Sequence, residues 1–419
     1  MSAPKNVKQK SAAGGGSSYV SFQRLDYAAE IAYYYGFTPV KSPAIGREDI
    51  VRSKRATESE THEKNYGNSE GGELFIRPEE KAALLRECEE KKMLNPSQTA
   101  MLYYEGAVSR GDHKKAGRGH YKELHLDILG TTKSVAEAEL IKTAIEILRQ
   151  KGFEDLYVDI NSIGDKDSLA NFTREVQQFY RKHGEELQTH CKAEAKKDPF
   201  KPLECDNPKC KEVCAQAPKS VSYLSEPSRI HFKEVLEYLE SMHIPYRIDN
   251  QVLGNRRICG HTIFLIKTLN VDEKKETPEE TLALGFRYNG LAKKLEMKHE
   301  VPGIGVTVVY KTSGKTRKRC HKQKKPRVYF IQFGFDAKLK SFEVIENLRH
   351  ARIPLYQSLA KDKLTAQMAT AENMNIPYVI LMGQKEALEN SVIVRDMGTR
   401  MQETVKIADL PVYLKKLSR

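Results

Sequence analysis

Four cysteines in the middle of the sequence are the side chains best suited to bind a metal ion. Cys191, Cys205, Cys210 and Cys214 fall within 24 of the 419 residues, with 13, 4 and 3 residues between them. Thiolates are preferred ligands of Zn²⁺, and a small segment gains stability by folding around the ion. The spacing differs from a pair of Cys-x-x-Cys hooks, so partly buried free thiols are the alternative, and His190 is a spare ligand.

Two clusters of basic side chains could contact the phosphates of a nucleic acid. The first lies in a glycine-rich segment and comprises Arg110, His113, Lys114, Lys115 and Arg118. The second places eight cations within residues 315–327, among them Arg317, Lys318 and Arg319. The alternatives are a solvated loop for the first cluster and a plain charged linker for the second.

The chain as a whole is basic. Its 69 Lys and Arg residues exceed its 56 Asp and Glu residues, for a formal charge of +13. This balance favours a polyanionic partner, with tRNA, rRNA, DNA and an acidic membrane all open. The chain has no Trp and only 14 Phe residues, so its composition gives no sign of an aromatic surface on which the bases of single-stranded nucleic acid could stack. Because no apolar stretch resembles a membrane span or signal peptide, we expect a soluble, cytoplasmic protein without a disulfide framework.

Hydrophobic periodicity predicts the elements that would position these side chains in the first part of the chain. Residues 1–17 are expected to form a disordered basic tail, and 51–72 a long polar loop. Helices are expected at 19–35, 78–88 and 135–151, and extended segments at 37–43, 74–76, 101–105, 121–130 and 156–160. The strands 101–105 and 121–130 would form a hairpin whose tip, 109–119, is positively charged.

The rest of the chain is predicted to hold an insertion, the remaining core strands and a separate C-terminal domain. Residues 165–248 carry amphipathic helical patterns and the four cysteines, which indicates a mostly helical insertion. Strands at 261–268, 282–287 and 304–311 would complete a core made of 18–164 and 249–313. After a basic linker at 314–327, strands and helices alternate over 328–419, which indicates a small α/β domain.

Several short segments occur in an order and at separations that indicate a known family. They are Gly36 to Pro43, Ile76-Arg77-Pro78-Glu79, Asn161-Ser162-Ile163-Gly164, Leu203-Glu204-Cys205, Gly285-Phe286-Arg287-Tyr288-Asn289-Gly290-Leu291, Gly383-Gln384-Lys385-Glu386 and Val394-Arg395-Asp396-Met397. Together they resemble histidyl-tRNA synthetases, which are class II aminoacyl-tRNA synthetases, over nearly the whole chain after residue 18. The resemblance implies an α+β core with an antiparallel sheet flanked by helices, a helical insertion and a C-terminal α/β domain of the anticodon-binding type.

The residues that such an enzyme uses to hold ATP and histidine are largely replaced. The family stabilises charge on the α-phosphate with three arginines, whose planar forks bind phosphate oxygens in pairs. Tyr103-Tyr104-Glu105-Gly106 stands at the family's Arg-x-Glu-Arg, while Gly254 and Thr312 occupy the other two arginine positions. Losing three charge-assisted hydrogen bonds would remove on the order of 5–9 kcal/mol of stabilisation. This is about a thousandfold to a millionfold in rate.

Some polar residues at family positions are retained. The candidate remnants of an ATP and histidine pocket are Glu79, Glu105, Arg118, Asp127, Arg287 and Tyr288. The alternative is that the charged residues of this set hold the hairpin and the sheet together through buried ion pairs. Lys81 replaces the threonine that follows Glu79 in the family. Four cations lie near enough in the sequence to compensate for the lost arginines, namely Lys122, Arg256, Arg257 and Lys311.

The sequence therefore predicts a homodimeric relative of histidyl-tRNA synthetases that binds tRNA or another structured RNA without aminoacylation activity. The likeness of the C-terminal domain implies that Arg395 and Gln402 contact RNA. The basic residues Arg110, Lys114, Lys115, Arg317, Lys318 and Arg319 would add phosphate contacts. Zinc is the candidate cofactor, and binding of ATP with magnesium is disfavoured. The alternatives are an active histidine-tRNA ligase with displaced catalytic residues, and a regulatory subunit or scaffold.

Overall fold

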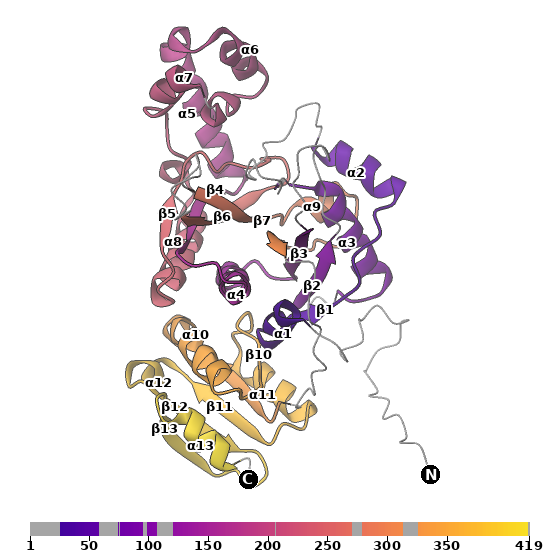
Figure 1. Cartoon of the computed structure of the whole chain (residues 1–419), viewed down its shortest axis with the longest axis vertical. Coiled ribbons are helices and arrows are strands. Elements are labelled where there is room, and N and C mark those ends of the chain that lie inside the picture. The colour runs from indigo at the N-terminus through magenta and orange to yellow at the C-terminus, as the bar shows by residue number, and fades with distance from the viewer. Residues whose placement is uncertain are drawn as a thin grey trace.

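The computed structural model describes residues 26–57, 74, 76–94, 99–106, 120–205, 207–269, 279–312 and 326–417. A large sheet with helices on both faces lies at the centre, a group of helices projects at one end, and a second sheet lies at the other (Figure 1). The predicted tail, the hairpin tip and most of the basic linker lie outside the described residues. Each helix in the described ranges is too short or too polar to cross a membrane.

The central sheet has eight strands in the order β1-β2-β3-β8-β7-β6-β4-β5. Its strands are β1 (Thr38–Pro39), β2 (Ala100–Gly106), β3 (His120–Leu129), β4 (Leu156–Gly164), β5 (Tyr246–Ile248), β6 (Gly260–Leu269), β7 (Glu279–Arg287) and β8 (Gly303–Thr312). The two outer pairs, β1 with β2 and β4 with β5, are parallel, and the inner pairs are antiparallel. The predicted hairpin is confirmed, because β2 and β3 pair from Ala100 opposite Leu129 to Gly106 opposite Glu123.

The two faces of this sheet have different partners. Side chains alternate between faces along a strand. Leu124 and Leu126 of β3 therefore pack with α1 (Tyr27–Tyr34) and α4 (Val135–Gln150). The residues between and beyond them, including His125 and Asp127, point to the face covered by α3 (Pro78–Glu90). This alternation determines which polar side chains of the core can meet.

Two local predictions in the first part of the chain are wrong. The start of the predicted polar loop belongs to a helix, α2 (Arg47–Thr57), which packs on α3. Its buried side includes Asp49 and Ser53, so it lacks the apolar periodicity by which helices are usually detected. Leu74 and Ile76, predicted as part of a strand, are buried in the core but belong to no strand of the described chain.

The segment between β4 and β5 is helical. It contains α5 (Lys166–His183), α6 (Thr189–Lys197), α7 (Pro208–Cys214) and α8 (Glu226–Ser241), with short 3₁₀ turns η1 (Gly184–Glu186), η2 (Lys201–Glu204) and η3 (Ser220–Tyr223). Asp165 caps α5 by accepting a hydrogen bond from the Ser168 backbone N–H at 2.9 Å. Helix α8 packs on α4, whereas α6, α7 and the far end of α5 extend away from the sheet (Figure 1).

The predicted α/β domain at the C-terminus is confirmed. Its sheet has the order β10-β9-β11-β12-β13, with strands β9 (Val328–Gln332), β10 (Leu355–Gln357), β11 (Tyr378–Met382), β12 (Ser391–Asp396) and β13 (Gln402–Lys406). The helices are α10 (Phe335–His350), α11 (Leu364–Asn373), α12 (Gln384–Leu388) and α13 (Leu410–Leu417). The sequence did not predict α12 or β13, because α12 has no buried residue and β13 has only Val405 buried, so neither shows an apolar pattern. Helix α10 joins this domain to the core, and Arg349 donates to Glu146 of α4 at 2.8 Å.

Candidate functional site

A buried ion pair lies on the α3 face of the central sheet. Lys81 Nζ donates to both carboxylate oxygens of Asp127, at 2.7 and 2.8 Å. The Tyr288 hydroxyl donates to the same carboxylate at 2.6 Å. Burial, followed by the negative charge of Asp127, raises the pKa of Tyr288 well above its usual value. The three side chains thus satisfy one another's hydrogen bonds. The sequence had predicted Asp127 and Tyr288 as residues of a substrate pocket.

A second group of charges adjoins this pair on the same face. Arg77 binds both oxygens of the Glu123 carboxylate, at 2.7 and 3.2 Å, and His125 Nε2 lies 3.0 Å from Glu123. Burial alone would raise the pKa of Glu123, but His125 and Arg77 lower it below its usual value. The Tyr104 ring stacks on His125 with 4.6 Å between ring centroids. Arg77 also donates to Glu80 at 3.1 Å, so this arginine is already paired with carboxylates.

Arg287 points to the opposite face and binds α4. Its Nε donates to Glu137 at 2.7 Å, a terminal nitrogen donates to the other oxygen of that carboxylate, and Thr131 O accepts at 2.9 Å. His231 Nε2 lies 2.8 Å from the same Glu137 oxygen that accepts from Arg287 Nε. Burial opposes ionisation of Glu137, yet Arg287 and His231 lower its pKa to about 2. Arg287 is fully buried, and its ion pair with Glu137 links β7 to α4.

Glu105 is also separated from Asp127 by the sheet. It lies 2.7 Å from Lys122 Nζ, and the same ammonium binds Asp26 at the start of α1. Burial opposes the charges of both Asp26 and Lys122. Each charge stabilises the other, however, so the pKa of Asp26 is lowered and the pKa of Lys122 is raised. Glu79 lies in the first turn of α3, partly exposed. Arg118 lies outside the described residues.

The six predicted pocket residues are therefore only partly brought together. Asp127 and Tyr288 are in contact, while Glu105 and Arg287 occupy the other face of the sheet. The interpretation of Asp127 and Arg287 as members of buried ion pairs agrees with these contacts. Sequence reasoning missed Glu123 and Glu137. For Glu123 the available signal was the alternation of Glu123, His125 and Asp127 with the apolar residues Leu124, Leu126 and Ile128.

Glycines occupy two positions where the resemblance implies arginines, and both are tightly packed. A Cβ atom added at Gly106 would come within 3.0 Å of two ring atoms of His125. Gly254 has a positive φ of 60°, and a Cβ there would overlap Ile263 and lie 3.2 Å from the sulfur of Cys259. Real Cβ atoms avoid such distances, so neither position accepts a larger side chain without rearrangement of its buried neighbours.

The cations proposed to compensate have partners of their own or cannot be placed. Arg256 binds Asp198, lies 3.6 Å from Glu204 and covers the Phe200 ring at 4.7 Å. All three partners belong to the insertion, between α6 and the end of η2. Lys122 is paired as described above, and the side chain of Lys311 lies outside the description. Arg257 is exposed on the same loop as Arg256.

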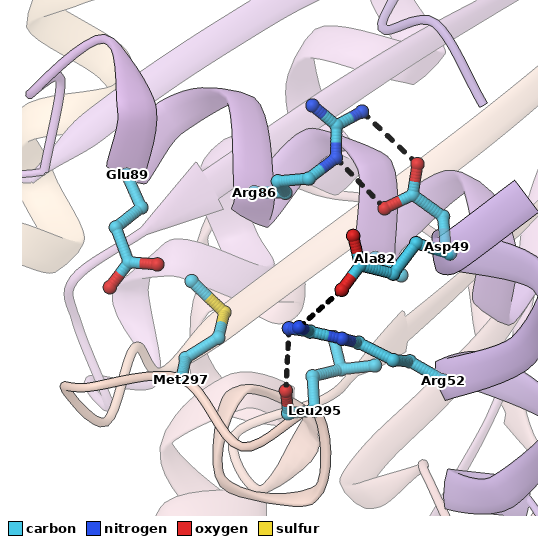
Figure 2. Close-up of a pocket in the computed structure, with 8 residues that line it drawn as sticks. Asp49, Arg52, Ala82, Arg86, Glu89, Leu295 and Met297 are labelled. Atoms are coloured by element: carbon cyan, nitrogen blue, oxygen red, sulfur yellow. Dashed lines mark hydrogen bonds and ion pairs between the residues drawn. The ribbon is translucent and has the colours of Figure 1, made fainter. Parts of the chain in front are cut away.

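A shallow pocket lies between α2, α3 and the loop after β7, and its charges are largely paired (Figure 2). Arg86 donates to both oxygens of Asp49, each at 3.0 Å. Arg52 binds Glu48 on its own helix and donates to Leu295 O at 3.4 Å. Met297 supplies an apolar wall. The arrangement fixes α2 on α3.

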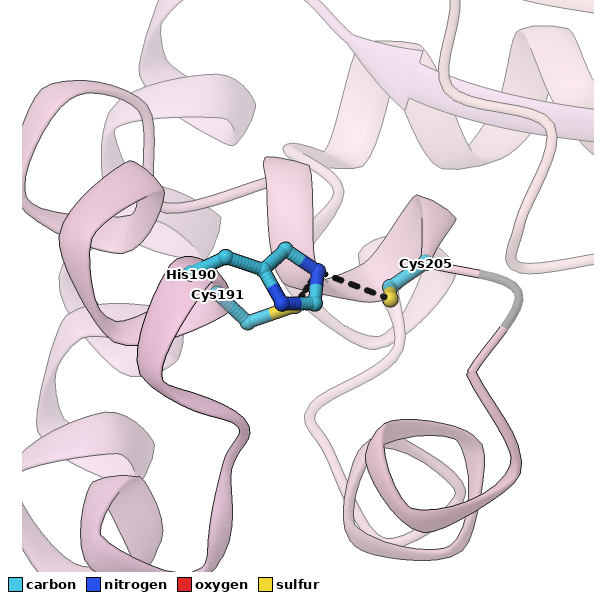
Figure 3. A group of neighbouring side chains, drawn as sticks. All are labelled: His190, Cys191 and Cys205. Atoms are coloured by element: carbon cyan, nitrogen blue, oxygen red, sulfur yellow. Dashed lines mark hydrogen bonds between the residues drawn. The ribbon is translucent and has the colours of Figure 1, made fainter.

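Two of the four predicted metal-binding cysteines, Cys191 and Cys205, meet at His190 in the projecting part of the insertion (Figure 3). His190 Nε2 lies 3.1 Å from Cys191 Sγ and 3.8 Å from Cys205 Sγ. Cys210 Sγ lies 3.5 Å from Cys191 Sγ. Cys214 takes a different direction, because its thiol donates to Pro202 O at 3.2 Å.

Two predicted RNA-binding residues lie side by side in the C-terminal domain. Arg395 of β12 and Gln402 of β13 are directly opposite each other in the strand register. Their inward-facing neighbours Val392 and Val405 are opposite each other as well and belong to the core. Arg395 is partly buried and Gln402 is exposed. The other predicted RNA contacts, Arg110, Lys114, Lys115, Arg317, Lys318 and Arg319, lie outside the described residues.

Comparison with known proteins adds the evolutionary context. Residues 327–417 match a family described as the anticodon binding domain. The chain is 28% identical over 400 residues to a histidine–tRNA ligase of Halothermothrix orenii, covering 94% of each chain, and 25% identical over 396 residues to one of Desulforamulus reducens, covering 92% of this chain and 93% of the relative. A solved structure titled apo histidyl-tRNA synthetase of S. aureus is 21% identical, with a TM-score of 0.49, over 92% of this chain and 93% of that one.

Proposed function

Because the chain belongs to the histidyl-tRNA synthetase family, we propose that it binds tRNA through its C-terminal domain and no longer joins histidine to ATP in its core. The proposal separates the two tasks of a synthetase, nucleotide chemistry and RNA recognition. The residues for the first task are replaced, and the domain for the second is retained.

The packing at Gly106 and Gly254 carries the catalytic half of the proposal. The resemblance implies an arginine at each of these two positions, and here the space beyond each Cα is filled by His125 and Ile263. The Lys81–Asp127 pair strengthens the argument, since Lys81 stands at the family's threonine position and binds a carboxylate of the sheet instead of a ligand. Electrostatic stabilisation requires donors aimed at the developing charge, and these donors are committed elsewhere.

The cross-strand pair of Arg395 and Gln402 supports the RNA-binding half. An arginine beside an amide presents charged and neutral donors on one face of β12 and β13, a combination suited to phosphate oxygens and base edges. The net charge of +13 favours approach of a polyanion over long distances.

Exchange of pyrophosphate into ATP, dependent on histidine, tests the catalytic half. We expect no exchange above background at saturating histidine and ATP, with an active histidine–tRNA ligase assayed in parallel as the positive control. Robust exchange by the purified chain would refute the loss of activity. It would favour the second candidate function, an active ligase, which the names of the relatives and their full-length coverage support.

Titration with tRNA over a range of salt concentrations tests the RNA-binding half. We expect specific binding that weakens as salt rises, because phosphate contacts release counterions. Arg395→Ala should weaken binding about tenfold, the loss of roughly one charged contact. Arg174→Ala on α5 removes an exposed cation of the same type and serves as the matched control. Equal affinities for both variants, or no preference for tRNA over other RNA of the same length, would contradict the proposal.

A further inference from the structure

The projecting end of the insertion has too small an apolar core to fix its own helices. Its buried cluster consists of Leu187, Cys191, Cys210 and Val213. Two of these four residues are cysteines, and the helices that carry them are short: α6 has nine residues and α7 seven. Segments of this size bury little apolar surface, and small units of this kind are commonly held by disulfides or metal ions.

We propose that this end of the insertion is a structural zinc site formed by His190, Cys191, Cys205 and Cys210. The set differs from the four cysteines indicated by the sequence, because His190 takes the place of Cys214. Three helical segments contribute: His190 and Cys191 from the start of α6, Cys205 from the residue after η2, and Cys210 from α7.

Three of the four ligand atoms lie close enough together to share one ion, and Cys210 adjoins this group through Cys191. Zinc bonds of about 2.3 Å to sulfur and about 2.0 Å to nitrogen require neighbouring ligand atoms to be roughly 3.5–3.8 Å apart. The ligand atoms of His190, Cys191 and Cys205 all lie within 4.8 Å of one another. The measured separations are 3.1 Å and 3.8 Å from His190 Nε2 to the two sulfurs, and 3.5 Å from Cys191 to Cys210. Figure 3 shows the imidazole of His190 directed at both of its cysteine neighbours.

Cys214 is excluded from the set by its contacts. Its thiol donates to the Pro202 carbonyl at 3.2 Å and lies 3.9 Å from the Tyr180 hydroxyl. Both partners belong to the scaffold around the site rather than to the ligand group. Cys214 therefore provides a control cysteine on the same short helix as Cys210.

The site has a structural consequence for the core. Glu204 directly precedes Cys205, and Asp198 follows α6, so an ion that ties α6 to η2 also fixes the two carboxylates that hold Arg256. Arg256 belongs to the loop that replaces the family's histidine motif. The bound ion would keep the insertion docked on this loop and keep Arg256 away from the centre of the sheet.

Metal analysis of the full-length chain, purified with reductant and equilibrated with Zn²⁺, tests the assignment. We expect one zinc per chain after removal of excess ion. Cys205→Ser and His190→Ala are the informative variants, since both residues are more exposed than Cys191 and their loss is less disruptive to folding. Each should reduce retained zinc severalfold, whereas Cys214→Ser and Cys88→Ser should retain one equivalent.

Cobalt substitution tests the ligand set by a separate signal. Co²⁺ in the full chain should show the intense visible bands of a tetrahedral site and thiolate charge-transfer absorption. Cys210→Ser should reduce this absorption by about a third, because one of three thiolates is lost. Absence of zinc in the reduced full-length chain, a Cys191–Cys210 disulfide found by mass analysis under the same conditions, or equal metal loss in Cys214→Ser would overturn the proposal.

Discussion

Lys81 and Asp127 form a two-pronged ion pair between α3 and β3, with side chains 3% and 0% exposed. Pairs of this kind cost much desolvation energy and contribute little net stability compared with apolar residues of the same size. Removing one partner is a different matter, because the other charge is left buried without compensation. The pair therefore fixes the arrangement of α3 over the sheet.

Lys81→Met should destabilise the protein by about 3 kcal/mol, since it leaves the Asp127 carboxylate with Tyr288 as its remaining donor. The double variant Lys81→Met, Asp127→Leu should recover at least half of that loss, because no unpaired charge remains. Urea unfolding followed by circular dichroism measures both changes. Equal stability of the single and double variants would show that the charge of Asp127 is not what the lysine compensates.

Arg287→Lys should also destabilise, by about 2–4 kcal/mol, although the charge is kept. Arg287 binds Glu137 with two nitrogens and reaches the carbonyls of Thr131 and Lys133, at 2.9 and 3.1 Å. An ammonium group cannot reach these acceptors together from one position. The thermal midpoint of unfolding reports the change, and Lys293→Arg on the exposed surface is the control for an exchange of cation type. A midpoint equal to that of the wild type would contradict the bridging role.

Gly305→Ala tests the packing beneath the Lys81–Asp127 pair. A Cβ at Gly305 would overlap a carboxylate oxygen of Asp127 and lie 2.8 Å from Lys81 Nζ. We expect a loss of about 2 kcal/mol from the forced displacement of the pair. Gly290→Ala is the matched control, because φ there is −90° and no atom lies within 4 Å of the added Cβ. If both variants unfold at the same urea concentration, the close packing of Gly305 against the Lys81–Asp127 pair does not contribute to the free energy of unfolding.

The sequence predicted the elements well where apolar residues recur, as in α4 and in strands β9 and β11 of the C-terminal sheet. It failed at α2, whose buried face is polar, and at Leu74 and Ile76, which are apolar but not extended in a sheet. For the candidate site, motif positions selected Asp127 and Tyr288, which are in contact in the fold. They could not show that Glu105 lies on the opposite face, because that depends on the register of β2 against β3, which is set by the folded sheet.

Glu139 lies in the first half of α4, at the contact between the core and the C-terminal domain, within electrostatic reach of Lys338 of α10. Burial raises the pKa of this carboxyl to about 8, and the positive charge of Lys338 offsets part of the increase. The carboxyl is therefore protonated in the folded protein at neutral pH and ionised in the unfolded chain. Between about pH 4.5 and 8 folding takes up a proton, so this group makes the folded state less stable as pH rises.

Glu139→Gln should remove this contribution, because an amide does not ionise. At pH 5 the stability of variant and wild type should differ by less than about 1 kcal/mol, and by pH 8 the variant should be more stable by roughly 4 kcal/mol. Urea unfolding at half-unit pH intervals measures the difference between the two curves, which cancels the titration of other groups. Glu343→Gln, on an exposed turn of α10, is the control for loss of one carboxylate and should follow the wild type. Parallel curves for Glu139→Gln and wild type would mean that Glu139 is ionised in the fold and that Lys338 stabilises its charge.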